Sequence, residues 1–127
     1  MKKMNLFFVA VLLGLSFFGC KKSSSDSNNI PVDLASNASG TYNGWSLLVT
    51  NDSVTAKTVI TKQSTSLVSV STTINNVPIS FTDVTVSDDG NGKIHLTQSA
   101  HDLSGTVNLK SLVYYINGVR FFSGSKP

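Results

Sequence analysis

The chain contains one cysteine, no glutamate and a single arginine among its 127 residues. One cysteine excludes an intramolecular disulfide. The two histidines, His95 and His101, lie six positions apart and do not fit a compact metal motif. Asp102 could orient the imidazole of His101, but no serine stands out as a nucleophile. We therefore expect neither catalysis nor a cofactor. The acidic segment 88–92 lacks the later acidic ligand of a calcium loop, so we expect it only to turn a hairpin.

The chain also lacks an apolar run that is long enough to span a bilayer. Its longest run, from Leu6 to Phe18, has 13 residues, whereas a membrane-spanning helix needs about 20. Two lysines precede the run and the small residue Gly19 follows it. A charged start, an apolar middle and a small residue at the end are typical of a cleaved secretory signal. We expect residues 1–19 to be removed.

Cys20 follows Gly19 directly, and a hydrophilic, serine-rich stretch comes next. This arrangement resembles the bacterial lipobox, with Phe17 and Phe18 where the usual pattern has leucine and a small residue. So loose a pattern resembles lipoproteins of the Bacteroidetes. The resemblance implies that Cys20 carries a diacylglycerol, with acyl chains such as palmitate, and anchors the chain in the cell envelope. The outer membrane is the expected location, with its face undetermined. The alternative is a buried or secreted free thiol.

The mature chain is expected to be almost neutral. Loss of Lys2 and Lys3 would leave eight of the ten basic side chains, against seven acidic ones. A balance this even offers no basic surface for nucleic acid.

Composition divides the remaining chain into a tether and one domain. Residues 20–37 are rich in Ser, Asn and Asp and hold too few apolar residues to order themselves, so we expect a flexible tether. Residues 38–127 are rich in Ser, Thr, Val and Asn, which is strand composition. Turn residues recur every 8 to 12 positions, as in an antiparallel meander. The predicted strands are 40–50, 53–62, 66–74, 77–87, 93–98, 103–109, 112–116 and 119–123.

Two-residue turns predict the register of each hairpin, and a slip of one residue would exchange its faces. A turn at residues 75–76 pairs Ile74 with Val77, Thr72 with Ile79 and Val70 with Phe81. The apolar residues occupy every second position up to Phe81 and resume at Val84, so the alternation breaks between them. This break indicates a bulge at Thr82-Asp83. A turn at Asn51-Asp52 pairs Val49 with Val54, Leu47 with Ala56 and Trp45 with Thr58, which puts Trp45 on the apolar face.

The last hairpin, which turns at Asn117-Gly118, has no plainly polar face. Leu112, Tyr114, Ile116, Val119 and Phe121 share one face, and Val113, Tyr115, Arg120 and Phe122 share the other. Either the second face is covered by another part of the chain, or it contacts a partner, a lipid surface or a ligand. In the contact version, Arg120 lies against the ring of Tyr115.

The strand that opens with Gly40-Thr41-Tyr42 resembles the start of lipocalin-like, or calycin-like, domains. Those domains begin with a Gly-x-Trp strand whose ring is covered by an arginine near the C-terminus, and here Tyr42 and Arg120 stand in those places. The resemblance implies an eight-stranded, up-and-down barrel. About 90 residues give each strand only 7 or 8. We therefore expect a small barrel that is filled by side chains or half open.

Two functions follow as expectations. A binding module for a small apolar ligand would have a pocket between Trp45, Phe81, Tyr114 and Phe121. A structural or assembly subunit of an envelope complex would have a filled interior and use Tyr115, Arg120 and Phe122 as its contact surface. Oligomers are compatible with both. Asp52-Ser53-Val54 resembles the O-glycosylation acceptor of the Bacteroidetes, which makes Ser53 a candidate for glycosylation.

Overall fold

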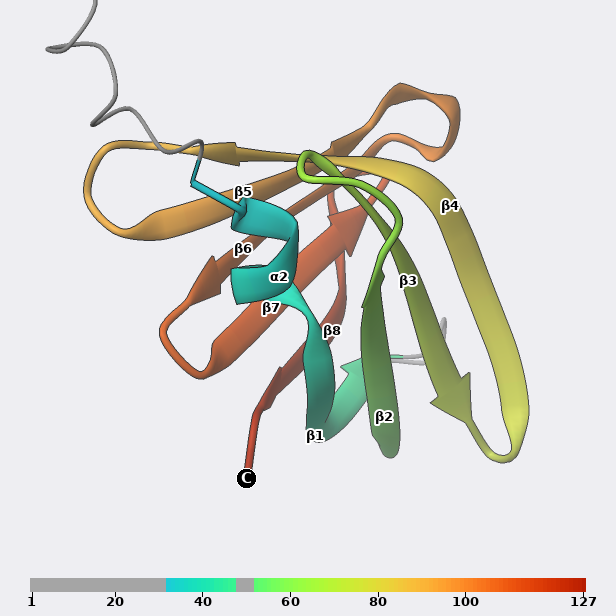
Figure 1. The fold of residues 1–127 in the computed structure, drawn as a ribbon. Coiled ribbons are helices and arrows are strands. Elements are labelled where there is room, and N and C mark those ends of the chain that lie inside the picture. The colour runs from blue at the N-terminus through green and yellow to red at the C-terminus, as the bar shows by residue number, and fades with distance from the viewer. Residues whose placement is uncertain (1–31, 48–51) are drawn as a thin grey trace, which may run out of the picture. The chain divides into compact units, whose positions relative to one another are not determined.

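The computed structural model describes residues 32–47 and 52–127, which form an eight-stranded antiparallel barrel (Figure 1). Each strand pairs with the next along the chain, and β8 pairs with β1 to close the barrel. The up-and-down meander expected from the sequence is thereby confirmed. The strands are β1 (Gly40–Leu47), β2 (Ser53–Lys62), β3 (Leu67–Ile74), β4 (Val77–Asp88), β5 (Lys93–Gln98), β6 (Leu103–Asn108), β7 (Ser111–Ile116) and β8 (Val119–Ser125).

Within residues 32–47 and 52–127, two short helices accompany the strands, α2 (Leu34–Ala38) and η3 (Ser99–His101). The prediction that the tether extends to residue 37 is wrong, because the folded unit begins at Val32 and α2 packs into the core with Ala35 and Ala38 fully buried. Leu34 also packs against the core, but the polar residues around these three side chains gave the segment a hydrophilic composition. Within the described residues, no helix has the length and apolar character needed to cross a membrane.

The β3–β4 hairpin has the predicted register. Ile74 lies opposite Val77, and Val70 opposite Phe81. The register then shifts, so that Val68 lies opposite Val84 and two residues of β4 face one of β3. One of these two, Asp83, has a φ of 56°. The predicted bulge at Thr82-Asp83 is therefore present.

The predicted register of β1 and β2 is wrong by three positions. Trp45 lies opposite Thr55 and not Thr58. Leu47 lies opposite Ser53, and this pairing is incompatible with the expected two-residue turn at Asn51-Asp52. The turn residue Asn51 itself lies outside the described residues. An odd shift exchanges the faces of a strand, so Tyr42 and Ser46 point into the barrel and Trp45 points outward.

The β7–β8 hairpin follows its predicted register for two pairs and then departs from it. Asn117 and Gly118 have φ values of 51° and 74°, as a two-residue hairpin turn requires. A bulge then makes Phe121 the extra residue, and Phe122 lies opposite Tyr114. The prediction that Phe122 lies on the outer face is therefore wrong, since its side chain is fully buried.

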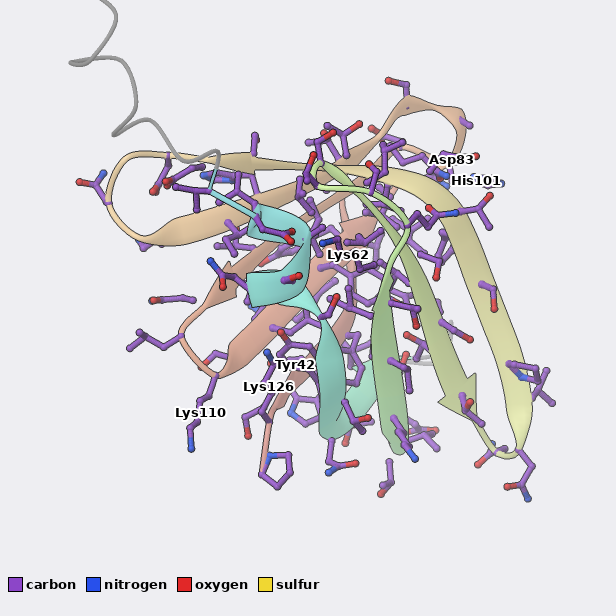
Figure 2. All side chains as sticks on the ribbon, in the orientation of Figure 1. Tyr42, Lys62, Asp83, His101, Lys110 and Lys126 are labelled. Carbon is purple, nitrogen blue, oxygen red and sulfur yellow. The ribbon has the colours of Figure 1, made fainter. Side chains whose placement is uncertain are left out.

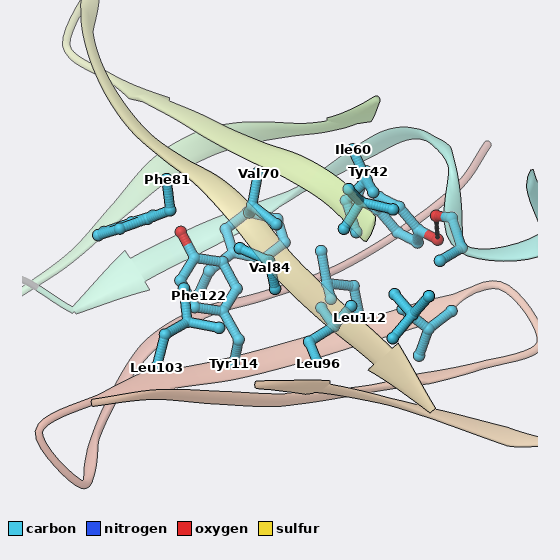
Figure 3. Close-up of a cluster of buried hydrophobic side chains, with 14 of the residues drawn as sticks. Tyr42, Ile60, Val70, Phe81, Val84, Leu96, Leu103, Leu112, Tyr114 and Phe122 are labelled. Carbon is cyan, nitrogen blue, oxygen red and sulfur yellow. Dashed lines mark hydrogen bonds between the residues drawn. The ribbon is translucent and has the colours of Figure 1, made fainter. Parts of the chain in front are cut away.

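The interior of the barrel is filled by side chains. Its fully buried members include Tyr42, Tyr114, Phe122, Leu96 and Leu112, none of which has any accessible surface (Figure 3). A side chain that lined a cavity large enough for water would retain accessible surface on that side. The centre of the barrel is therefore packed at the density of an ordinary protein core.

Candidate functional site

The four residues expected to line a ligand pocket are divided between the two sides of the barrel wall. Phe81 and Tyr114 point inward and are buried in the packed core. Phe121 is half buried at the β8 bulge, with its ring centroid 5.5 Å from that of Tyr114. Trp45 lies outside. These four residues therefore do not come together around a pocket at the centre of the barrel.

The interior instead holds a chain of hydroxyl groups. Thr58 Oγ1 lies 2.5 Å from Thr72 Oγ1, which lies 2.6 Å from the Tyr114 hydroxyl. Within the described residues, no buried side-chain nitrogen or oxygen is without a hydrogen-bond partner. The three hydroxyls thus satisfy one another and offer nothing to a bound molecule. They stabilise the core, because a buried polar group is costly only when it is left unpaired.

Removal of the middle hydroxyl tests this network. We expect Thr72→Val to lower the free energy of unfolding by at least about 1 kcal/mol, because Thr58 and Tyr114 lose the group that joins them. Urea denaturation measures the change. Thr73→Val, at the neighbouring outward position, is the control and should change stability by less than about 0.5 kcal/mol. Equal stability of the two variants would contradict the network.

Two buried tyrosines make the fold sensitive to alkali. Burial raises the pKa of Tyr42 and that of Tyr114 from 10.0 to about 12. The folded state therefore disfavours tyrosinate, and the stabilisation is complete below pH 10 and is lost as the pH rises from about 10 to about 12.

The urea midpoint should accordingly fall across that interval, and tyrosinate absorbance should appear together with unfolding. Tyr114→Phe removes one of the two linked groups, so its midpoint should depend less steeply on pH. A wild-type midpoint that stays constant up to pH 12 would contradict this assignment.

One end of the barrel is closed by α2 and by a lysine from the C-terminus. The Tyr42 hydroxyl donates to the Ala38 carbonyl at 2.6 Å, and Lys126 Nζ donates to the Ser39 carbonyl at 2.8 Å. Lys126 Nζ also lies 5.1 Å from the centre of the Tyr42 ring (Figure 2). The lipocalin resemblance implied that Arg120 covers the Tyr42 ring. That expectation is wrong, because the cation over this ring is Lys126. Burial lowers the pKa of Lys126.

The start of α2 is fixed to the barrel by an ion pair. Asp33 caps the helix by accepting from the Ser36 backbone amide at 3.0 Å, and it also pairs with Lys62 of β2. The Lys62 ammonium, followed by the Ser36 donors, lowers the pKa of Asp33 to about 2. This exposed pair adds little to the docking of α2, which depends mainly on the buried Ala35 and Ala38.

Arg120 lies on the outer face, beside two aromatic residues. Its guanidinium carbon lies 5.9 Å from the centre of the Trp45 ring, which is a cation–π distance. Tyr115 lies directly opposite Arg120 in the β7–β8 ladder. The ring under the guanidinium is therefore that of Trp45, in place of the expected Tyr115. We call Trp45, Tyr115 and Arg120 the outer patch.

A groove opens at the α2 end of the barrel. It has a volume of about 450 Å³. Its lining residues are Val32, Leu34, Asn37, Asp88, Gly92, Ile94, Val107 and Leu109. The sequence did not predict this groove, because Val32 and Leu34 belong to the segment expected to be a tether and not to the expected barrel. Leu109 was expected within the strand 103–109, whereas β6 ends at Asn108 and Leu109 lies exposed in the following turn.

His101 and Asp89 contact neighbouring side chains and backbone groups. His101 Nδ1 lies 2.8 Å from Gln98 Oε1, and its ring packs edge-on against Phe81. Asp89 Oδ1 accepts from the Asn91 amide at 2.8 Å, which lowers the pKa of Asp89 and shapes the hairpin turn. Within residues 32–47 and 52–127, no group of three or more His, Cys, Asp or Glu side chains could hold a metal.

Ser53 is exposed and is the first residue of β2. Its glycosylation remains a prediction.

Comparison with known proteins assigns no family to this barrel: no family model, no curated protein and no solved structure gives a significant match to the chain.

Proposed function

We propose that this protein is a lipoprotein of the cell envelope, held in the membrane through Cys20, whose barrel is a non-catalytic interaction module. The support for the anchor is in the sequence, where a charged start and an apolar run lead to Gly19-Cys20. Two acyl chains on one residue give stable attachment, whereas a single chain binds only weakly and reversibly. Residues 1–31 lie outside the described part of the chain, so this proposal depends on the sequence pattern alone.

The filled interior favours interaction through the outside of the barrel. Eight-stranded barrels that carry a ligand need an unfilled centre, and here Tyr114, Phe122 and Leu96 occupy it without accessible surface. This single observation supports the assembly subunit over the carrier of an internal apolar ligand. A ligand inside the barrel would require several of these side chains to move.

The outer patch is the part of the wall best suited to a protein partner. Tryptophan, tyrosine and arginine are the residue types that contribute most to protein interfaces. Trp45 and Tyr115 are half buried and Arg120 is exposed, so all three are partly accessible. The guanidinium above the Trp45 ring is held in place before a partner arrives, which lowers the entropic cost of binding.

Photo-crosslinking in the native envelope tests this proposal. A photoreactive residue at position 115 of the full chain should form a crosslink to a protein of defined mass, and Arg120→Ser should weaken it strongly. Lys57→Ser, which removes an exposed lysine of β2, is the matched control and should leave the crosslink intact. No crosslink, or equal loss in both variants, would contradict the role of the outer patch.

A further inference from the structure

We propose that the α2 end of the barrel rests on the lipid leaflet in which Cys20 is anchored, and that the groove there receives an acyl chain of a membrane phospholipid. This inference rests on the proposed anchor at Cys20. It goes further by naming the surface that faces the bilayer and the chemistry of its occupant.

The first support is the composition of the groove. Five of its eight lining residues are aliphatic, namely Val32, Leu34, Ile94, Val107 and Leu109. Val32 is 64% exposed and Leu109 is 85% exposed. These two side chains at the rim remain in water unless another molecule covers them, and each would gain about 25 cal/mol for every Å² of apolar surface removed from water.

The second support is the backbone of Leu109. Its φ is 54°, a left-handed conformation that costs a residue other than glycine about 1–2 kcal/mol. Glycine, asparagine or aspartate is the usual choice at such a turn position. Leucine here neither relieves the strain nor joins the core. Contact with a lipid would remove the apolar side chain of Leu109 from water and so offset the cost of its backbone conformation.

The third support is the distance that the chain can span. The folded unit begins at Val32, which is itself on the groove rim. Eleven residues, 21–31, separate Val32 from Cys20, and such a segment spans at most about 40 Å when fully extended. Val32 is the described residue nearest to Cys20 in the sequence, so the groove that it lines lies within that distance of the anchor.

The charge beside the groove is mixed, so the inference depends on the apolar lining and on the length of the chain to Cys20. Lys93 and Lys110 are exposed and directly follow the lining residues Gly92 and Leu109; Lys110 projects away from the barrel (Figure 2). Each lysine near an anionic leaflet contributes about 1 kcal/mol. Three acidic residues lie there as well: Asp88 on the groove wall, Asp89 directly after it, and Asp33, which directly follows Val32 and pairs with Lys62.

Fluorescence quenching in vesicles tests this orientation. The full chain is produced with Val32→Cys or with Val119→Cys and labelled with a thiol-reactive NBD dye. It is then reconstituted into vesicles of phosphatidylethanolamine with a minor share of phosphatidylglycerol, some carrying spin-labelled acyl chains. Val32 and Val119 are both 64% exposed, and Val119 lies in the β7–β8 hairpin at the opposite end of the barrel, which makes the pair matched. Leu109→Cys is a second probe of the groove.

We expect the dyes at positions 32 and 109 to be quenched several-fold more than the dye at 119. Equal quenching at the two ends, or none at 32 and 109 in protein that floats with the vesicles, would overturn this inference and leave the anchor intact. Wild-type chain without added cysteine is the control for the anchor. If it takes up the dye at Cys20 and fails to float, the proposed anchor is wrong and the inference falls with it.

Discussion

Cys20→Ser will transfer the protein from the membrane fraction to the soluble fraction. Each buried methylene of an acyl chain contributes about 0.8 kcal/mol to membrane attachment, so two chains outweigh every other contact that the protein offers. The lysines at 93 and 110 would retain it only weakly, at about 1 kcal/mol each. Fractionation of cells that express the full chain measures the change, which should be nearly complete.

The matched control is Ser25→Ala, close to the same site, which should leave the protein in the membrane fraction. Incorporation of labelled palmitate should be lost in Cys20→Ser and retained in the control. A Cys20→Ser protein that stays with the membrane would mean that another part of the chain holds it there.

Gly44→Ala will destabilise the barrel severely, because it acts at the seam where β8 meets β1. Gly44 lies opposite Gly124 in this pairing. A Cβ at position 44 would lie 2.0 Å from the Ser123 carbonyl oxygen and 2.5 Å from Gly124 Cα. Both neighbours are backbone atoms and cannot rotate away, so the two strands must separate. We expect a loss of about 3 kcal/mol or more, a large part of the stability of a domain of this size.

Thermal and urea unfolding of the full chain measure this loss. Gly92→Ala is the control because a Cβ there meets no atom within 4 Å, although φ is 78°. It should cost only about 1 kcal/mol, from backbone strain alone. Similar losses in the two variants would mean that the β1–β8 seam tolerates a side chain and that closure does not depend on the glycine pair.

The sequence predicted the strands well because composition and turn residues are local signals. The β3–β4 register and its bulge followed from the two-residue turn at Asn75-Asn76 and from the parity change after Phe81. The same reasoning failed between β1 and β2, because the pairing of Leu47 with Ser53 excludes the expected two-residue turn. The wrong register led to the prediction that Trp45 lies on the inner, apolar face, whereas its side chain points outward.

The candidate site was harder to predict because it depends on contacts between distant segments. A bulge of one residue at Phe121 moved Phe122 from the outer face into the core. Lys126, three residues beyond the last predicted strand, reaches back to Ser39 and Tyr42. No local pattern indicates such contacts. Arg120 and Tyr115 were correctly expected to be neighbours, but the ring beneath the guanidinium belongs to Trp45.

The mass of the mature protein, isolated from its own envelope, tests the central proposal most directly. We expect a chain that begins at Cys20 and carries a diacylglycerol with its acyl chains on that first residue. Fragmentation would locate the lipid and would separate it from any glycan at Ser53. A chain that keeps residues 1–19, or one that begins elsewhere with Cys20 as a free thiol, would contradict the account.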